Sequence, residues 1–274
     1  MRSCIGRRTV TGYSPEVALG EDTCLRLPPA RLLRWEIFAV FAVSLGASGL
    51  NALLDLVGAL LTRHSLASQQ ALLVGSLAVN HWLDLVLQLV GMAEALAPVV
   101  LVLYLMARSG EPPSTIGLDA SEPARDLARG AVLAALIGGA GLALYLTAFH
   151  LGLSLTVVPE SLPGVWWRIP VLLLSAAHDG LLEEILVIGY LLRRLDQLGW
   201  TPWKAILFAA VLRGSYHLYQ GFGAFLGNAV MGVIFGILYR RWGRVMPLII
   251  AHTLIDAVAF IGYAALHGKV SWLP

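Results

Sequence analysis

The sequence predicts an all-α fold, a polytopic membrane helical bundle of about seven transmembrane helices. Of the 274 residues, 58% are hydrophobic and only 13% are charged, and the mean hydropathy is +0.75. Soluble domains carry about a quarter charged residues. The apolar residues also gather in stretches of about 20, the length at which a helix crosses a hydrocarbon core. The composition therefore excludes a soluble globular domain, a disordered chain and a coiled coil.

Seven apolar stretches are predicted to cross the membrane. They comprise residues 35–61, 84–107, 128–155, 166–192, 202–220, 222–239 and 245–266. A further run, Ala71 to Val79, has only nine residues. Because this run is too short for a spanning helix, we expect it to be interfacial or re-entrant.

The chain divides into a polar tail, residues 1–34, and a transmembrane domain, residues 35–274. The tail lacks the apolar core of a cleavable signal peptide. The only two cysteines, Cys4 and Cys24, lie in this tail, which excludes a disulfide scaffold and a cysteine-rich metal site. The net charge of +2 gives no reason to expect a nucleic-acid partner. The expected surroundings are the lipid bilayer.

The distribution of basic residues predicts which way the bundle faces. Of the nineteen lysines and arginines, fifteen lie on the tail's side of the predicted spans, three on the other side, and Arg213 within a span. Cytoplasmic loops carry the excess of basic residues in membrane proteins. The N-terminus is therefore predicted to be cytoplasmic and, after seven crossings, the C-terminus lies outside. Seventeen arginines against two lysines further suggest GC-rich coding and a bacterial cell membrane.

Ionisable side chains are concentrated in the second half of the transmembrane domain. The fourth, fifth and seventh stretches contain His178, Asp179, Glu183, Glu184, Arg213, His217, His252 and Asp256. The first three stretches hold only Asp55 and Glu94 as deep charged candidates. Charged groups at mid-bilayer are costly and normally face a bundle interior or a wet cavity. Any chemistry is therefore expected in the second half.

Spacing places these residues in pairs on shared helix faces. Arg213 and His217 are four residues apart, as are His252 and Asp256, and Asp179 lies four residues before Glu183. Three such faces can converge on one cavity, where a glutamate can act as a general base. Two histidines and a glutamate can instead bind zinc, with the second glutamate as the base. Both arrangements activate water, and paired acids and histidines also build ion pathways in transporters.

Three segments together resemble the CAAX-processing and bacteriocin-processing (CPBP, or ABI) family of intramembrane endopeptidases. These segments read GLLEEILVIGYLLRRL, GSYHLYQG and GNAVMGVIFGILYRRWGRVMPLIIAHTLIDAVAF. The resemblance lies in the order of a Glu-Glu pair, a histidine in the next span and a final histidine with a polar residue four positions later. It covers about residues 166–265, which we take as the catalytic core.

The resemblance implies a role for each residue of the pattern. Glu183 stands at the glutamate that activates the attacking water, and Glu184 at the adjacent supporting glutamate. His217 and His252 match the histidines of the second and third motifs. Asp256 occupies a position that is often asparagine and is thought to help form the oxyanion site. The resemblance favours glutamate chemistry without a cofactor, with zinc held by Glu183, His217 and His252 as the variant.

Besides Asp256, two positions depart from the family pattern. Ile188 stands where the first motif usually has an arginine, and Arg213 stands where the second motif usually has a phenylalanine. We hypothesise that Arg213 supplies the cation that is missing at position 188. Because an isolated buried arginine is costly, Arg213 is predicted to pair with a carboxylate, Glu184 or Asp256.

The sequence therefore predicts an intramembrane endopeptidase that hydrolyses a membrane-associated peptide or protein. Two other functions fit parts of the pattern. A non-catalytic member of the family would bind a membrane partner, for example in bacteriocin immunity. An ion-coupled transporter would need a continuous polar route to both faces, for which the first three stretches offer few charges.

Overall fold

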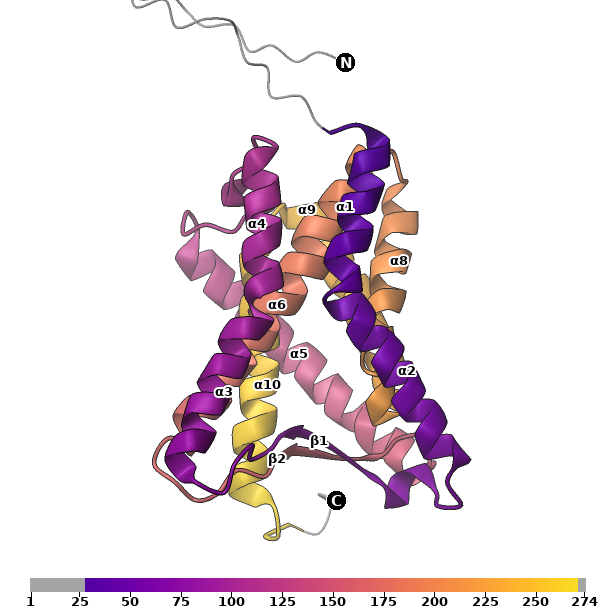
Figure 1. Ribbon diagram of the computed structural model, residues 1–274, viewed down its shortest axis with the longest axis vertical. Helices are drawn as coiled ribbons and strands as arrows, with labels where there is room; N and C mark the ends of the chain where they lie inside the picture. The colour runs from indigo at the N-terminus through magenta and orange to yellow at the C-terminus, as the bar shows by residue number, and fades with distance from the viewer. Residues whose placement is uncertain (1–27, 271–274) are drawn as a thin grey trace, which may run out of the picture.

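The computed structural model describes residues 28–270. The larger part of the predicted tail, residues 1–27, lies outside the described residues, and so do both cysteines. The described chain is almost entirely helical, with one small sheet. Figure 1 shows helices packed side by side at one end of the molecule and splayed apart at the other. The start of α1 and the end of α10 lie at opposite ends.

The first two predicted stretches each contain a pair of helices rather than one continuous helix. Helices α1 (Ala30–Ala42) and α2 (Leu45–Leu61) meet at an angle of 49°. At the bend, the Ser44 hydroxyl donates a hydrogen bond to the carbonyl of Val40. Helices α3 (His81–Ala95) and α4 (Ala97–Arg108) follow each other closely enough to form one 28-residue candidate span.

The remaining stretches supply the rest of the bundle. Helix α5 spans Pro123–His150, and α6 spans Arg168–Glu183. A π-helical segment, Glu184–Leu191, continues α6 into α7 (Leu192–Gln197). Helix α8 (Pro202–Ser215), α9 (Phe222–Trp242) and α10 (Met246–Leu266) complete the bundle. Short 3₁₀ turns occupy Leu66–Ser68, Pro113–Ile116 and Leu218–Gln220.

The number of helices that qualify as membrane spans is smaller than the seven spans predicted from the sequence. Within residues 28–270, four helices are long and apolar enough to cross a bilayer, or five if the bent α1–α2 pair is one span. Helices α6 and α8 are too short on their own, at 16 and 14 residues. The all-α membrane fold is therefore confirmed, with four or five candidate spans, while seven crossings and a cytoplasmic N-terminus stay predictions.

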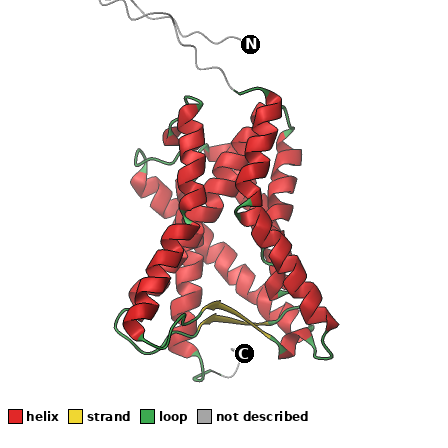
Figure 2. Cartoon of the chain, viewed as in Figure 1, coloured by secondary structure: helices red, strands yellow, loops and turns green. Residues whose placement is uncertain are grey.

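Two short parallel strands, a feature the sequence did not predict, lie at the splayed end. Strand β1 (Gln70–Val74) pairs with β2 (Thr156–Glu160) in the register Gln70 to Thr156 and Val74 to Glu160. Figure 2 shows this pair crossing the wide end of the bundle. The prediction of helix up to residue 155 was wrong, because α5 ends at His150. The partners lie more than 80 residues apart in sequence, so local periodicity could not reveal the pairing.

The core is built around the π-helical segment, whose eight residues are all buried. Glycines let neighbouring helices approach this core closely. A Cβ on Gly180 of α6 would lie 2.7 Å from the Thr253 hydroxyl of α10, and one on Gly232 of α9 would lie 2.9 Å from the Ala210 backbone of α8. In lipid, the hydrophobic effect does not drive helices together. Small residues instead let the helix backbones approach closely, so that van der Waals packing holds them together.

At the closely packed end, Arg244 joins the α4–α5 linker to the α9–α10 turn. Its guanidinium donates to Asp119 at 2.9 Å and to Asp126 at 2.7 Å. Hydrogen bonds from Ser121 and from Arg244 lower the pKa of Asp119 to about 2. The lowered pKa means that ionised Asp119 stabilises the folded state above its ordinary pKa of 3.8.

We predict that this stabilisation is lost as the pH falls from about 4 to about 2. In an Asp119→Asn variant, the melting temperature should fall less over this range than in the wild-type protein. Thermal unfolding followed by circular dichroism in detergent measures the difference. Glu122→Gln is the control, because Glu122 forms an exposed pair with Arg125 that contributes little. Equal pH dependence in Asp119→Asn and wild type would contradict the prediction.

Candidate active site

The two adjacent glutamates lie where α6 changes into the π-helical segment. Glu183 is the last residue of α6, and Glu184 is the first residue of the π-helical segment. Glu184 is fully buried, and Glu183 is 8% exposed. In an α-helix, the side chains of consecutive residues point about 100° apart around the helix axis. Here the carboxylates of two consecutive residues nevertheless contact the same arginine. π-helical turns are rare in proteins, and those that occur are often found at functional sites.

Arg213 of α8 is the residue that contacts both carboxylates. Its Nη1 lies 2.6 Å from Glu184 Oε1, and its Nη2 lies 3.2 Å from Glu183 Oε2. The guanidinium is fully buried and lies over the ring of Phe235, with 5.5 Å to the ring centroid. The predicted pairing of Arg213 with Glu184 is confirmed, and Glu183 is a second partner. Ile188 is fully buried in the apolar core.

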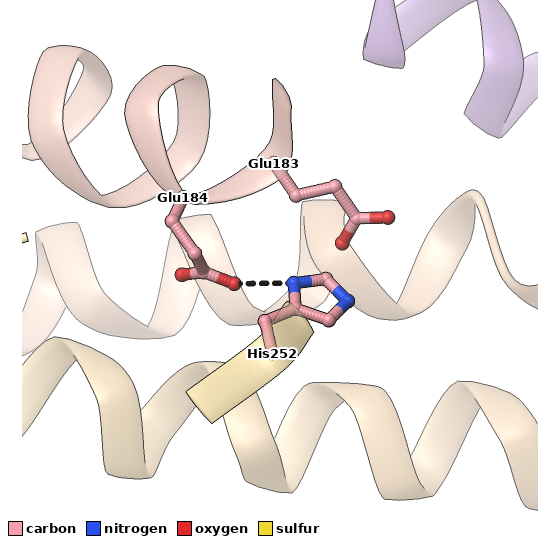
Figure 3. Close-up of side chains that lie close together, drawn as sticks. All are labelled: Glu183, Glu184 and His252. Atoms are coloured by element: carbon pink, nitrogen blue, oxygen red, sulfur yellow. Dashed lines mark hydrogen bonds and ion pairs between the residues drawn. The ribbon is translucent and has the colours of Figure 1, made fainter. Parts of the chain in front are cut away.

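His252 of α10 completes the buried cluster. Its Nδ1 lies 2.8 Å from Glu184 Oε1 and 3.2 Å from Arg213 Nη2. Figure 3 shows the contact with Glu184 as a dashed line. Because the guanidinium can only donate, the shorter contact assigns the Nδ1 proton to a hydrogen bond with Glu184. The Nε2 atom lies 3.3 Å from Asp256 Oδ2, one turn further along α10. His252 is therefore held between two carboxylates.

His217 follows α8 and faces Glu183 across a short gap. Its Nδ1 lies 3.1 Å from the carbonyl oxygen of Arg213, so Nδ1–H is the donor in that bond. The other nitrogen, Nε2, is then the ring's acceptor, and it lies 4.0 Å from Glu183 Oε1. The histidine and the glutamate predicted to activate water are thus adjacent without touching.

Tyr216 is a member of the site that the sequence pattern did not single out. Its hydroxyl donates to Glu183 Oε2 at 2.8 Å. Arg213 contacts the same oxygen, so Oε1 is left facing His217. A tyrosine beside a motif histidine carries no signal of its own, because its contact depends on how α8 packs against α6.

One large cavity, of about 1140 Å³, brings these residues together. The predicted site residues Glu183, His217, His252 and Asp256 all line it, and Tyr216 does so as well. Glu184 and Arg213 are not among its lining residues and lie behind Glu183 and His252. The rest of the wall is mostly apolar, with contributions from α3, α5 and α9.

Two further ionisable residues on α6 line the same cavity. His178 Nδ1 lies 2.9 Å from Asp179 Oδ1, and both residues lie about one turn before Glu183. Neither has a counterpart in the family pattern. They extend the polar part of the cavity away from the Glu183 and His252 cluster.

Among the described residues, Glu183, Glu184 and His252 form a candidate metal-ligand group, with ligand atoms within 4.8 Å of one another. This set has Glu184 where the sequence suggested His217. The guanidinium of Arg213, however, lies 2.6 Å and 3.2 Å from oxygens of the two glutamates. A fixed positive charge at these oxygens opposes a divalent cation. The cluster is therefore a poor fit to a zinc ion.

Comparison with known proteins supports the family resemblance for the part of the chain that carries the site. Residues 164–258 match a family described as type II CAAX prenyl endopeptidase Rce1-like. The matched segment contains every predicted site residue and nearly coincides with the predicted core, residues 166–265. No curated protein and no solved structure matches the chain.

The buried ion pair yields a prediction about stability. Replacing Arg213 by Ala should destabilise the protein by about 3–5 kcal/mol, because it leaves the Glu184 carboxylate buried without its cation. Unfolding of the purified protein in detergent, measured by circular dichroism, gives this difference. Arg125→Ala, at an exposed pair, should change stability by less than about 1 kcal/mol. Similar stability of the two variants would show that Arg213 is not required by the glutamates.

Proposed function

We propose that the protein is an intramembrane endopeptidase that uses Glu183 and His217 to activate water. The family match supports membrane endopeptidase activity in general, for an integral membrane protein with a peptide substrate. The observation that carries the specific proposal is the 4.0 Å gap between Glu183 Oε1 and His217 Nε2 on the wall of the cavity. A water molecule about 2.8 Å from both atoms fits between them.

Glu183 is the general base of the proposed reaction. Tyr216 and Arg213 hold its Oε2, which leaves Oε1 to take a proton from the water. The hydroxide oxygen then bonds to the scissile carbonyl carbon, and the carbonyl oxygen becomes an oxyanion. When the carbon–nitrogen bond breaks, the proton held by Glu183 passes to the leaving amine. Atoms and charges balance without a cofactor.

His252 and Asp256 line the same cavity as Glu183 and His217. As an imidazolium, His252 would keep its Nδ1–H bonded to Glu184 and would also carry an Nε2–H that can donate to the developing oxyanion. A protonated Asp256 carboxyl would add a second donor. The bond from Nδ1 to Glu184 fixes the orientation of the ring. Glu184 and Arg213 are positioning residues in this scheme, because they act through Glu183 and His252.

The proposed orientation follows the basic residues of the closely packed end. Arg193 and Arg194 of α7 pair with Glu111, which follows α4, and Arg240 near the end of α9 pairs with Asp196 of α7. Arg241 follows Arg240 in the last turn of α9, and Arg244 pairs with Asp119 in the α4–α5 linker. An excess of arginine marks a cytoplasmic face. We therefore place this end in the cytoplasm and the splayed end with its sheet on the outer side, and we propose a bacterial cell membrane as the location.

Cleavage should depend on Glu183. The purified protein in liposomes should cleave members of a library of synthetic single-span apolar peptides, with products identified by mass spectrometry. Glu183→Gln should lower the rate by at least about 10²–10⁴-fold, because the amide cannot accept the water's proton. Circular dichroism should show the same helix content in this variant.

Two further variants distinguish the loss of base catalysis from a general loss of structure or activity. Glu94→Gln changes an exposed residue of α3 that does not line the cavity, and it should leave cleavage unchanged. Tyr216→Phe removes one hydrogen bond to Glu183 and should lower kcat about tenfold with KM preserved. Full activity of folded Glu183→Gln would refute the proposed water activation.

We further propose that the reaction needs no metal ion. The contacts of Arg213 with both glutamates support this proposal. Cleavage in the liposome assay should survive dialysis against EDTA and 1,10-phenanthroline, and zinc addition should not raise the rate. Loss of activity on chelation, restored by zinc, would instead favour the metal-dependent variant.

A further inference from the structure

The two-stranded sheet has one edge that is open to another strand. Thr156 N–H donates to the carbonyl of Gln69, and in a parallel ladder of this register the N–H and C=O of Ala71 both point toward β2. Those of Gln70 and Leu72 therefore point away from β2. Within residues 28–270, these outward groups have no hydrogen-bond partner. Both residues are exposed, Leu72 by 48%.

The other edge of the sheet is closed. The outward N–H of Val157 on β2 donates to the Tyr145 hydroxyl of α5 at 3.0 Å. The next outward position on β2 is Pro159, which has no N–H to offer. Prolines and covering side chains are the usual means of protecting a sheet edge from further pairing. Among residues 28–270, nothing comparable protects the edge of β1.

The sheet also forms part of the wall of the active-site cavity. Leu73 of β1 and Val157 and Pro159 of β2 lie on one face of the sheet, and all three line the cavity that contains Glu183 and His252. A third strand added beside β1 would extend this face. Its alternate side chains would then point to the same side as Leu73.

We propose that the free edge of β1 binds an extended segment of the peptide substrate by strand addition. This inference rests on the proposed function and names its substrate more closely: an apolar peptide with a non-helical stretch at the splayed end of the bundle. Main-chain hydrogen bonds to Gln70 and Leu72 hold this stretch, and the adjoining residues enter the cavity. An extended backbone also exposes its peptide bonds, whereas a helix engages them in its own hydrogen bonds.

Binding should be measured separately from cleavage, in the inactive Glu183→Gln protein. The probe is the fluorescently labelled hexapeptide acetyl-Leu-Val-Leu-Ala-Leu-Val-amide, titrated with protein in detergent micelles and followed by anisotropy. Two further peptides of the same sequence carry N-methyl groups on alternate residues, one peptide for each of the two possible phases. One phase should bind about tenfold more weakly, because it loses the main-chain donors that face β1.

The matched protein variants are Leu72→Pro and Leu72→Ala, both in the Glu183→Gln background. Proline removes the outward N–H of residue 72 without touching the ladder to β2, and it should weaken binding of the unmodified peptide about tenfold. Alanine keeps the N–H and should bind within about twofold of the parent. Equal thermal unfolding of both variants shows that the fold is retained.

The outcomes separate this inference from the proposed function. If peptide binding is weakened by N-methylation and by Leu72→Pro, but the wild-type protein cleaves no library peptide, strand addition is upheld and the proposed endopeptidase activity is refuted. If library peptides are cleaved, but neither N-methylation nor Leu72→Pro changes peptide binding, strand addition alone is refuted. Absence of peptide binding would refute it as well. Light scattering tests a second copy as the occupant: a dimer that Leu72→Pro converts to monomer would also overturn the inference.

Discussion

The buried guanidinium of Arg213 constrains how the other residues of the site are arranged. A charge of this kind inside a membrane protein is tolerated only when counter-charges meet it directly. The two glutamates that meet it come from the junction of α6 with the π-helical segment, and His252, which bonds to Glu184, comes from α10. Three segments of the chain are thus required to meet at one point. The charges of the candidate site therefore also constrain how these helices pack.

The same contacts make the two carboxylates unequal. Glu184 is fully buried, and its Oε1 contacts both Arg213 and His252. Glu183 has one oxygen held by Arg213 and Tyr216, while the other faces His217 and the cavity. A difference in surroundings separates two identical side chains into a positioning group and a candidate base. The adjacent pair in the sequence therefore does not imply two equivalent roles.

The cavity explains why backbone at the splayed end can leave the helical conformation. Irregular or extended backbone within a membrane protein is tolerated where it lines a polar cavity or is buried in protein. Strands β1 and β2 line the active-site cavity, whose mostly apolar wall also carries the polar side chains of Glu183, His217 and Asp256. In the described part of the chain, the edge of β1 is unprotected whereas that of β2 is protected, so a further strand can be added only beside β1.

The sequence by itself determined the helical membrane class, the clustering of ionisable groups in the second half and the identity of most site residues. These features depend on local composition and on spacing along one helix, which a single stretch of sequence records. Even the need of Arg213 for a carboxylate partner could be predicted from the cost of a buried charge. Only the tertiary structure decided that the partner is Glu184 together with Glu183, that Tyr216 joins the site, and that two distant segments pair as strands. Each of these contacts joins different segments of the chain, so its existence depends on packing geometry that no periodicity within either segment encodes.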